Sequence, residues 1–218
     1  MWSRRDNDLT NLYCMKSDIK AIIFDFGGVL IDWNPRYLYQ NYFPEQPHAM
    51  ERFLAEIDFY KWNDQQDKGR PFAKGIEDLS TKFPQHAVLI KKYYECWEES
   101  VGGPISGSVE ILQKLKQKDY PLYGLSNWSA ETYPQVRQKY QFFEWFDDIV
   151  LSGNVKMTKP DPAIFKLLLN KIGYTAPECV LIDDSQTNID TAKKLGFIAV
   201  QFSSSEQLRS ELQELNLL

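Results

Sequence analysis

Apolar and polar residues follow two different patterns along the chain, and the more regular one begins at about residue 106. Short continuous apolar runs, typical of strands buried on both faces, occupy residues 122–126, 148–152, 179–183 and 197–202. Apolar positions recur at helical spacing in the segments around them, at residues 106–118, 161–173, 187–196 and 204–215. Strands that alternate with helices in this way predict an α/β protein built on a parallel sheet with helices on both faces.

An earlier apolar run at residues 21–24 has the same character, and it is followed at once by Asp25, Gly27 and Gly28. A carboxylate at the end of a strand that is covered on both faces is unfavourable unless another group pairs with it. A turn at the strand end is the alternative explanation, because Asp and Gly both favour turns.

The segment between residues 33 and 105 has a different pattern. It contains no run typical of a buried strand, but helix-like runs span residues 50–62 and 86–100, and Trp, Tyr and Phe are frequent. We therefore predict one α/β core, formed by residues 18–32 and 106–218, that is interrupted by a helical insertion at residues 33–105. Most of the aromatic residues are expected to form the core of that insertion.

The composition of the chain argues against two classes of partner, nucleic acids and membranes, without identifying a partner. The chain has 218 residues, of which 43 % are apolar and 25 % charged, as in an ordinary soluble globular protein. A net charge of −5 without a basic stripe gives no reason to expect a nucleic-acid partner. No stretch reaches the roughly 18 apolar residues of a membrane helix, so no membrane partner is expected.

The cysteines and the N-terminus bear on location. The three cysteines lie far apart without a C-x-x-C motif, which fits reduced thiols in a cytoplasmic protein better than disulfides or zinc. Residues 1–17 are polar and lack the apolar core of a signal peptide, so we interpret them as a loose leader. Met1 and Met15 are both candidates for the natural start.

Polar residues stand at the ends of several predicted strands or in the loops just beyond them. In an open parallel sheet, ligands bind beyond the carboxyl ends of the strands. Each also has an ordinary explanation. The pairs Ser126–Asn127 and Asp183–Asp184 are explained equally well as helix caps, and Lys159 as a surface lysine. Their occurrence together favours one site made of Asp25, Ser126, Asn127, Lys159, Asp183 and Asp184.

With these residues in place, the chain resembles the haloacid dehalogenase superfamily of aspartate-nucleophile hydrolases. The four motifs of that superfamily correspond to "DFGGV", "LSN", the lysine of "KP" and "DDSQTN", and the resemblance extends from residue 19 to about 202. It implies a Rossmann-like core with an inserted helical cap. The D-x-G-x-V form of the first motif is similar to a branch of small-molecule phosphatases that includes sugar phosphatases of the glucose-1-phosphatase type.

The resemblance implies that Asp25 attacks phosphorus and that the resulting aspartyl-phosphate is then hydrolysed. Three clustered carboxylates would repel one another, and oxygen ligands favour Mg²⁺ as the cation that keeps them ionised. By resemblance, Asp25, the carbonyl of Gly27 and Asp184 hold this ion, with Asp183 close by. Glycine at 27 and at 28 lets the backbone approach the metal and the phosphate.

The remaining motif residues are implied to act on the phosphoryl group. Ser126 and the amide of Asn127 would hold its oxygens, together with the N-terminus of the helix that follows. Lys159 would neutralise negative charge on the nucleophile and on the group being transferred. The substrate implied is a small phosphorylated metabolite, such as a sugar phosphate, and the protein is expected to be a monomer or weak dimer.

One position departs from the pattern of the superfamily. Most of its phosphatases carry a second aspartate two residues after the nucleophile, as general acid–base, and here that position is Gly27. Asp32 is a candidate replacement, although a turn residue is the simpler explanation for it. In the insertion, Asp64, Asp67 and Arg70 are candidates for contacts with hydroxyls or with a second charged group of the substrate.

Three alternatives to a phosphatase remain at this point. A 2-haloacid dehalogenase would also lack the second aspartate, but such enzymes work without metal and do not usually carry an acidic pair like Asp183 and Asp184. A phosphomutase would use the same nucleophile. A non-catalytic protein that binds a small molecule would have no need of Asp25.

Overall fold

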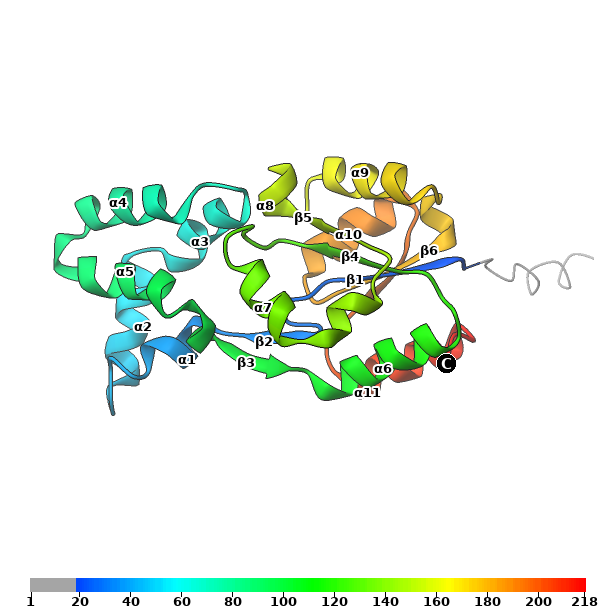
Figure 1. Ribbon diagram of the computed structural model, residues 1–218, viewed down its shortest axis with the longest axis horizontal. Coiled ribbons are helices and arrows are strands. Elements are labelled where there is room, and N and C mark those ends of the chain that lie inside the picture. The colour runs from blue at the N-terminus through cyan, green and yellow to red at the C-terminus, as the bar shows by residue number, and fades with distance from the viewer. Residues whose placement is uncertain (1–18) are drawn as a thin grey trace, which may run out of the picture.

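The computed structural model describes residues 19–218, so the expectations for residues 1–17, including the leader, Met15 and Cys14, lie outside the described residues (Figure 1). Its centre is a five-stranded sheet in the order β5-β4-β1-β6-β7. All neighbouring strands pair in parallel, which confirms the predicted α/β class. The strands are β1 (Ala21–Phe24), β4 (Leu122–Ser126), β5 (Asp148–Leu151), β6 (Cys179–Asp183) and β7 (Ile198–Gln201).

The two faces of the sheet are covered by different helices, because side chains alternate between the faces along each strand. Ile22 and Phe24 belong to the core beneath α6 (Ser106–Gln117) and α11 (Ser205–Glu214), and Figure 1 shows these two helices together below the sheet. Ala21 and Ile23 belong to the core that contains α9 (Pro162–Ile172) and α10 (Gln186–Leu195). Burial on both faces accounts for the uninterrupted apolar sequence of β1.

The strand register brings several chain segments to one edge of the sheet. Phe24, the last residue of β1, pairs with Gly124 in β4 and with Ile182 in β6. The backbone N–H of Asp25 continues the ladder by donating to the carbonyl of Ile182 at 2.9 Å. The residues that follow these three strands therefore meet at their carboxyl ends.

Residues 34–100, here called the helical insertion, lie between two short antiparallel strands, β2 (Ile31–Trp33) and β3 (Val101–Pro104). Figure 1 shows the insertion beside the sheet, at the end of the molecule opposite the C-terminus. Its helices are α1 (Pro35–Tyr39), α2 (Pro47–Glu56), α3 (Phe59–Asp67), α4 (Phe72–Lys82) and α5 (Ala87–Glu95), with short 3-10 helices at Pro84–His86 and Trp97–Ser100.

Aromatic side chains form the interior of the insertion, as expected. The Tyr93 ring lies 4.8 Å from the ring of Phe59 and 5.7 Å from that of Trp62, while Tyr39 and Phe53 are in contact at 4.9 Å. Large rings supply much buried area per residue, which a small group of short helices needs in order to be stable.

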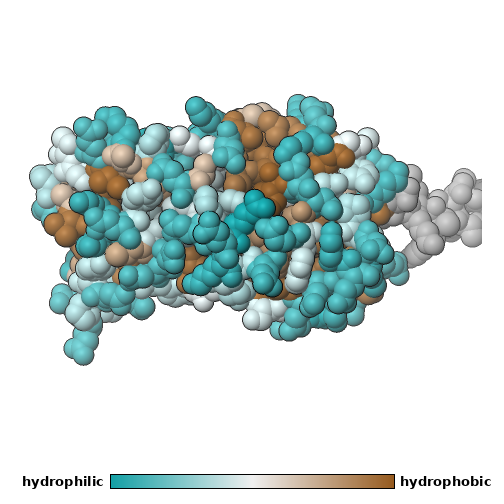
Figure 2. Space-filling view, viewed as in Figure 1, coloured by the Kyte–Doolittle hydropathy of each residue, from teal (hydrophilic) through white to brown (hydrophobic). Residues whose placement is uncertain are grey.

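Four further segments complete the core. They are α7 (Tyr133–Lys139), α8 (Ser152–Val155) and two 3-10 helices at Gln141–Trp145 and Ala176–Glu178. Figure 2 shows polar residues over most of the visible face, with apolar residues gathered where α8 and α9 lie. Among the helices of residues 19–218, none combines the length and the apolar character required to span a bilayer.

Candidate active site

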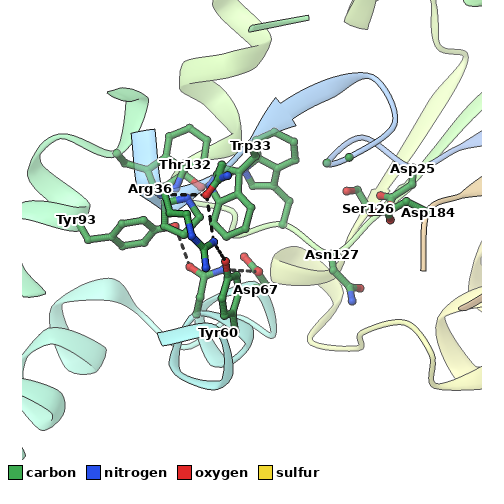
Figure 3. A pocket seen from close by; sticks show the side chains of 17 residues that line it. Asp25, Trp33, Arg36, Tyr60, Asp67, Tyr93, Ser126, Asn127, Thr132 and Asp184 are labelled. Atoms are coloured by element: carbon green, nitrogen blue, oxygen red, sulfur yellow. Dashed lines mark hydrogen bonds between the residues drawn. The ribbon is translucent and has the colours of Figure 1, made fainter. Parts of the chain in front are cut away.

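A cavity of about 390 Å³ opens where the strand ends face the helical insertion. Asp25, Gly28, Ser126 and Asp184 line it from the sheet, and Figure 3 shows three of these side chains grouped together on one side. Residues of the insertion form the opposite side. The site predicted at the strand ends is therefore a concave surface to which two parts of the chain contribute.

Lys159 is almost completely buried beneath this surface, with 4 % of it exposed. Its Nζ lies 3.0 Å from Asp25 Oδ2 and 2.5 Å from Asp183 Oδ2, so one ammonium group joins two of the carboxylates. These carboxylates outweigh the effect of burial and raise the pKa of Lys159. The surface-lysine explanation does not apply, since Lys159 is held as a cation inside the site.

The side chain of Asn127 fixes the backbone of Lys159. Its Nδ2 donates to the Lys159 carbonyl at 2.9 Å, and its Oδ1 accepts from the Lys159 N–H at 2.8 Å. Two bonds of this kind join the loop after β4 to the loop before α9. The Asn127 side chain is thus engaged in positioning Lys159, and its backbone amide is the part available to a ligand.

Asp183 has no exposed surface, and both of its carboxylate oxygens are engaged. They accept from Lys159 Nζ, from Asn188 Nδ2 at 2.9 and 3.1 Å, and from the Ser185 backbone at 2.9 Å. This set of donors fixes the Asp183 carboxylate, which in turn orients Lys159. A direct bond to a metal would require some of these contacts to be given up.

The carboxylates of Asp25 and Asp184 are better placed to hold a cation. Within the described part of the chain, Asp25, Asp183 and Asp184 form a cluster whose ligand oxygens lie within 4.8 Å of one another. Burial raises the pKa of Asp25, Lys159 lowers it, and Asp183 and Asp184 raise it again, with a net value of about 7. The pKa of Asp184 is also raised, by burial and then by Asp183. A divalent cation with oxygen ligands would stabilise both groups as anions.

The two glycines after Asp25 have different roles in this geometry. Gly28 has a φ of +75°, and a Cβ there would collide with the carboxylate of Asp184, so only glycine fits. Gly27 also lines the cavity, but a Cβ at that position would meet nothing within 4 Å. The place of the aspartate found in most phosphatases of the superfamily is therefore open space.

Asp32 lies on the β2 strand rather than in the cavity. Its Oδ2 accepts a hydrogen bond from Tyr37 Oη at 2.8 Å, and its side chain lies against Gly102 of β3. Asp32 is absent from the described residues that line the cavity. The structure thus does not bring this candidate acid together with the other predicted residues.

The insertion contributes residues that the sequence analysis did not identify. Arg36, in α1, donates to both oxygens of Glu51 at 2.5 and 2.7 Å and to Tyr60 Oη at 2.6 Å. Asn34 caps the same helix by accepting from the Arg36 N–H, ahead of Pro35. An Asn–Pro pair predicts such a helix start, but nothing in it indicates that the helix borders a cavity. Aromatic rings line the wall as well: Tyr60, Tyr93 and Trp97 from the insertion, Trp33 from β2, and Trp128 from the loop after β4.

Of the three insertion residues proposed for substrate contacts, Asp67 is the one that lines the cavity. Its Oδ1 accepts from the Ser129 N–H at 3.0 Å, and its Oδ2 accepts from Asn63 Nδ2 at 2.8 Å. Arg70 instead donates to Gln66 Oε1 and to the Trp62 carbonyl. Neither Arg70 nor Asp64 is among the cavity-lining residues in the described part of the chain.

The fold and the site together define an α/β protein with an acidic centre at the carboxyl ends of its parallel strands. The chain belongs to the haloacid dehalogenase-like hydrolase family, whose model matches residues 19–196. The family predicted from the sequence motifs is therefore confirmed. The prediction that the protein is a hydrolase is confirmed as well.

Two characterised relatives are phosphatases. A sesquiterpene phosphatase of Aspergillus oryzae is 24 % identical over 206 residues, which cover 92 % of this chain and 98 % of that protein. A D-ribitol-5-phosphate phosphatase of Bacteroides thetaiotaomicron is 23 % identical and covers 89 % of this chain and 97 % of its own.

Among solved structures, a haloacid dehalogenase family enzyme of Bacteroides thetaiotaomicron was crystallised with magnesium and inorganic phosphate. It is 26 % identical to this chain, has a TM-score of 0.66, and covers 85 % of this chain and 95 % of its own.

Proposed function

We propose that this hydrolase is an Mg²⁺-dependent phosphatase that acts on a small phosphorylated metabolite through an aspartyl-phosphate on Asp25. The observation that carries the proposal is the buried Lys159 between Asp25 and Asp183, beside a cavity that Asp184 also lines. Because Lys159 is a fixed cation in contact with Asp25, which lines the cavity, it would favour attack by Asp25 on an anionic substrate. The phosphatase relatives and the magnesium–phosphate complex of the structural relative support the same choice.

In the proposed first step, an Asp25 oxygen forms a bond to phosphorus while the ester P–O bond breaks and the leaving group departs. In the second step, water attacks phosphorus, and the acyl-phosphate P–O bond breaks to return the Asp25 carboxylate and inorganic phosphate. Ser126 Oγ and the Asn127 N–H would hold the phosphoryl oxygens, and Lys159 would offset their charge. Mg²⁺ held by Asp25, Asp184 and the Gly27 carbonyl would supply further charge neutralisation.

The wall of the cavity favours a leaving group that has both apolar and hydroxyl character. Trp33, Tyr60 and Trp97 offer ring surfaces, whereas Asn34 and Asn63 offer amide groups. A sugar phosphate stays a prediction within this class. A panel of sugar, polyol, terpenyl and nucleoside monophosphates, assayed with Mg²⁺, would rank these leaving groups directly.

Metal removal should abolish activity. We expect phosphate release from 4-nitrophenyl phosphate to fall to background with excess chelator and to return when Mg²⁺ exceeds it, because Asp25 and Asp184 need a cation to be ionised side by side. Phosphate release is measured directly, with Ca²⁺ addition as the comparison, since Ca²⁺ replaces Mg²⁺ poorly where a compact octahedral shell is needed.

Full activity in chelator would contradict the metal requirement. Turnover of 2-chloropropionate in place of phosphate esters would select the dehalogenase alternative, which is therefore assayed in parallel. A phosphomutase would instead transfer the phosphoryl group to a second substrate with little net phosphate release.

The cellular location and the oligomeric state of the enzyme stay proposals based on the sequence. We place it in the cytoplasm, with reduced thiols, and the described Cys96 and Cys179 are both free. We also expect a monomer or weak dimer, which light scattering after size-exclusion chromatography would test.

A further inference from the structure

The open position at Gly27 leaves the departing oxygen without an obvious proton donor, so we searched the described cavity wall for another one. Asp25 and Asp184 have roles in the proposed function. Tyr93 already donates to Asn63 Oδ1 at 3.0 Å. Tyr60 is 47 % exposed, and its Oη lies against the Arg36 guanidinium, so it is not enclosed in the cavity as a carboxyl group of the wall is. Asp67 is the remaining carboxyl group that lines the cavity.

Asp67 is held firmly at the boundary between the sheet and the insertion. It is the last residue of α3, and its two oxygens accept from Ser129 in the loop after β4 and from Asn63 one helical turn earlier. Its backbone carbonyl accepts from the hydroxyl of Ser152. Ser129 lies in the loop that begins with Asn127, directly after Ser126 at the end of β4, where the phosphoryl group would bind. Figure 3 shows Asp67 beside Tyr60 on the insertion side of the cavity, across from Asp25, Ser126 and Asp184.

The surroundings of Asp67 favour its protonated form. Burial raises its pKa most, Asp64 raises it further, the Ser129 N–H lowers it, and Asp25 raises it, with a net value of about 8. Tyr93 also faces it, as a neutral hydroxyl whose pKa is raised by burial and by Asp67. Arg36, the cation of the cavity wall, is paired with Glu51. A carboxyl group in these surroundings keeps its proton at neutral pH, as a general acid must.

We propose that Asp67 is the general acid–base of this enzyme and takes over from the helical insertion the role that Gly27 cannot perform. The proposal rests on the proposed phosphatase function. As the ester P–O bond breaks, the Asp67 hydroxyl gives its proton to the leaving oxygen and becomes a carboxylate. When water then attacks the aspartyl-phosphate, the Asp67 carboxylate takes a proton from that water, so the group returns to its starting state.

The first test is the Asp67→Asn variant, assayed on phosphate esters of similar size and graded leaving-group pKa. General acid catalysis is worth about 10²- to 10⁴-fold for a poor leaving group, so kcat/KM should fall by that factor for alkyl esters. It should fall far less for 4-nitrophenyl phosphate, whose leaving group departs readily as an anion. A plot of log(kcat/KM) against leaving-group pKa should therefore be shallow for the wild type and steep for the variant.

The pH profile gives an independent readout. A general acid must begin protonated, so wild-type kcat/KM for an alkyl ester should decline as pH rises above about 8, where the pKa of Asp67 lies. The Asp67→Asn variant should lack this decline. If Asp67 had only a structural role, the Asp67→Asn variant would lose activity but would keep the decline of kcat/KM at high pH.

A matched control separates proton supply from docking of the insertion. Glu131 accepts from the Phe72 N–H at 2.9 Å, so it also joins the insertion to the core, but it does not line the described cavity. Glu131→Ala should leave the leaving-group slope at the wild-type value. Equal steepening in Glu131→Ala would show that loosened docking is the cause, and it would overturn the assignment of Asp67.

The most demanding test is rescue. A Cβ at Gly27 meets nothing within 4 Å, so the double variant Asp67→Asn with Gly27→Asp places an acid where most phosphatases of the superfamily carry one. The double variant should recover a shallow leaving-group dependence. A slope for Asp67→Asn that equals that of the wild type would overturn the proposal, as would steepening in Asp32→Asn instead. If wild-type turnover of 4-nitrophenyl phosphate does not depend on Asp25, the proposed function fails instead.

Discussion

Replacement of Asp25 by Asn should lower kcat for phosphate esters by about 10³-fold or more, as removal of an attacking nucleophile does in other covalent enzymes. The amide keeps the shape of the carboxyl but lacks the negative oxygen that would bond to phosphorus. The fold should survive, because Lys159 retains its contact with Asp183 and the Asn side chain can still accept from the Phe26 N–H. Phosphate release and circular dichroism measure the two effects.

The control for this variant is Asp190→Asn, which neutralises an exposed carboxylate of α10 that accepts from Gln186 at 2.7 Å. It should retain wild-type turnover. Trapping of radiolabelled phosphate on the wild-type protein, and its loss in Asp25→Asn, would identify the covalent step. Residual turnover within tenfold of the wild type would instead exclude Asp25 as the nucleophile.

Most of the sheet and its helices were predictable because local signals and burial agree there. The runs at residues 122–126 and 179–183 coincide with β4 and β6, and each owes its apolar sequence to helices on both faces. Helix ends were marked as clearly: α9 and α10 both end at a glycine with positive φ, Gly173 and Gly196.

The insertion was predictable as helical but not in detail. The pattern at residues 50–62 indicates one helix, whereas the chain breaks at Asp58, whose φ is +50°, between α2 and α3. A non-glycine residue in that conformation is rare, and nothing in the local sequence specifies it. The strand β3 was also missed, since its sequence, Val-Gly-Gly-Pro, lacks strand propensity and pairs only because β2 lies beside it.

The candidate site was also predictable where the sheet positions its residues, and not where the position of a residue depends on how the insertion docks. Asp25, Ser126, Lys159 and Asp184 could be brought together in advance because parallel strands present their carboxyl ends at one edge. The insertion wall depends on how α3 docks against the core. Asn63 and Asp67 lie four residues apart on one face of α3 and reach the cavity together, whereas Asp64 falls on another face.

Replacement of Lys159 by Met should have the largest effect on stability, because it leaves Asp183 as a buried anion without its cation. Loss of one partner from a buried ion pair costs about 3–5 kcal/mol in the free energy of unfolding. Activity should fall as well, since Asp25 loses the neighbour that lowers its pKa and the phosphoryl group loses its lysine. Urea denaturation measures the change in the free energy of unfolding, and phosphate release measures the change in activity.

A double-mutant cycle with Asp183→Asn shows whether the pair is responsible. In the Asp183→Asn background Lys159→Met leaves behind only the Asp25 carboxyl group, whose pKa burial already raises, so the substitution should destabilise the protein much less than it does in the wild type. Lys166→Met, which removes an exposed lysine from α9, serves as the matched control and should change stability little. If the cost of Lys159→Met is the same in both backgrounds, then Asp183 is not the group that Lys159 stabilises. The loss would then come from the contact of Lys159 with Asp25 or from packing of the lysine stem, both of which the two backgrounds share.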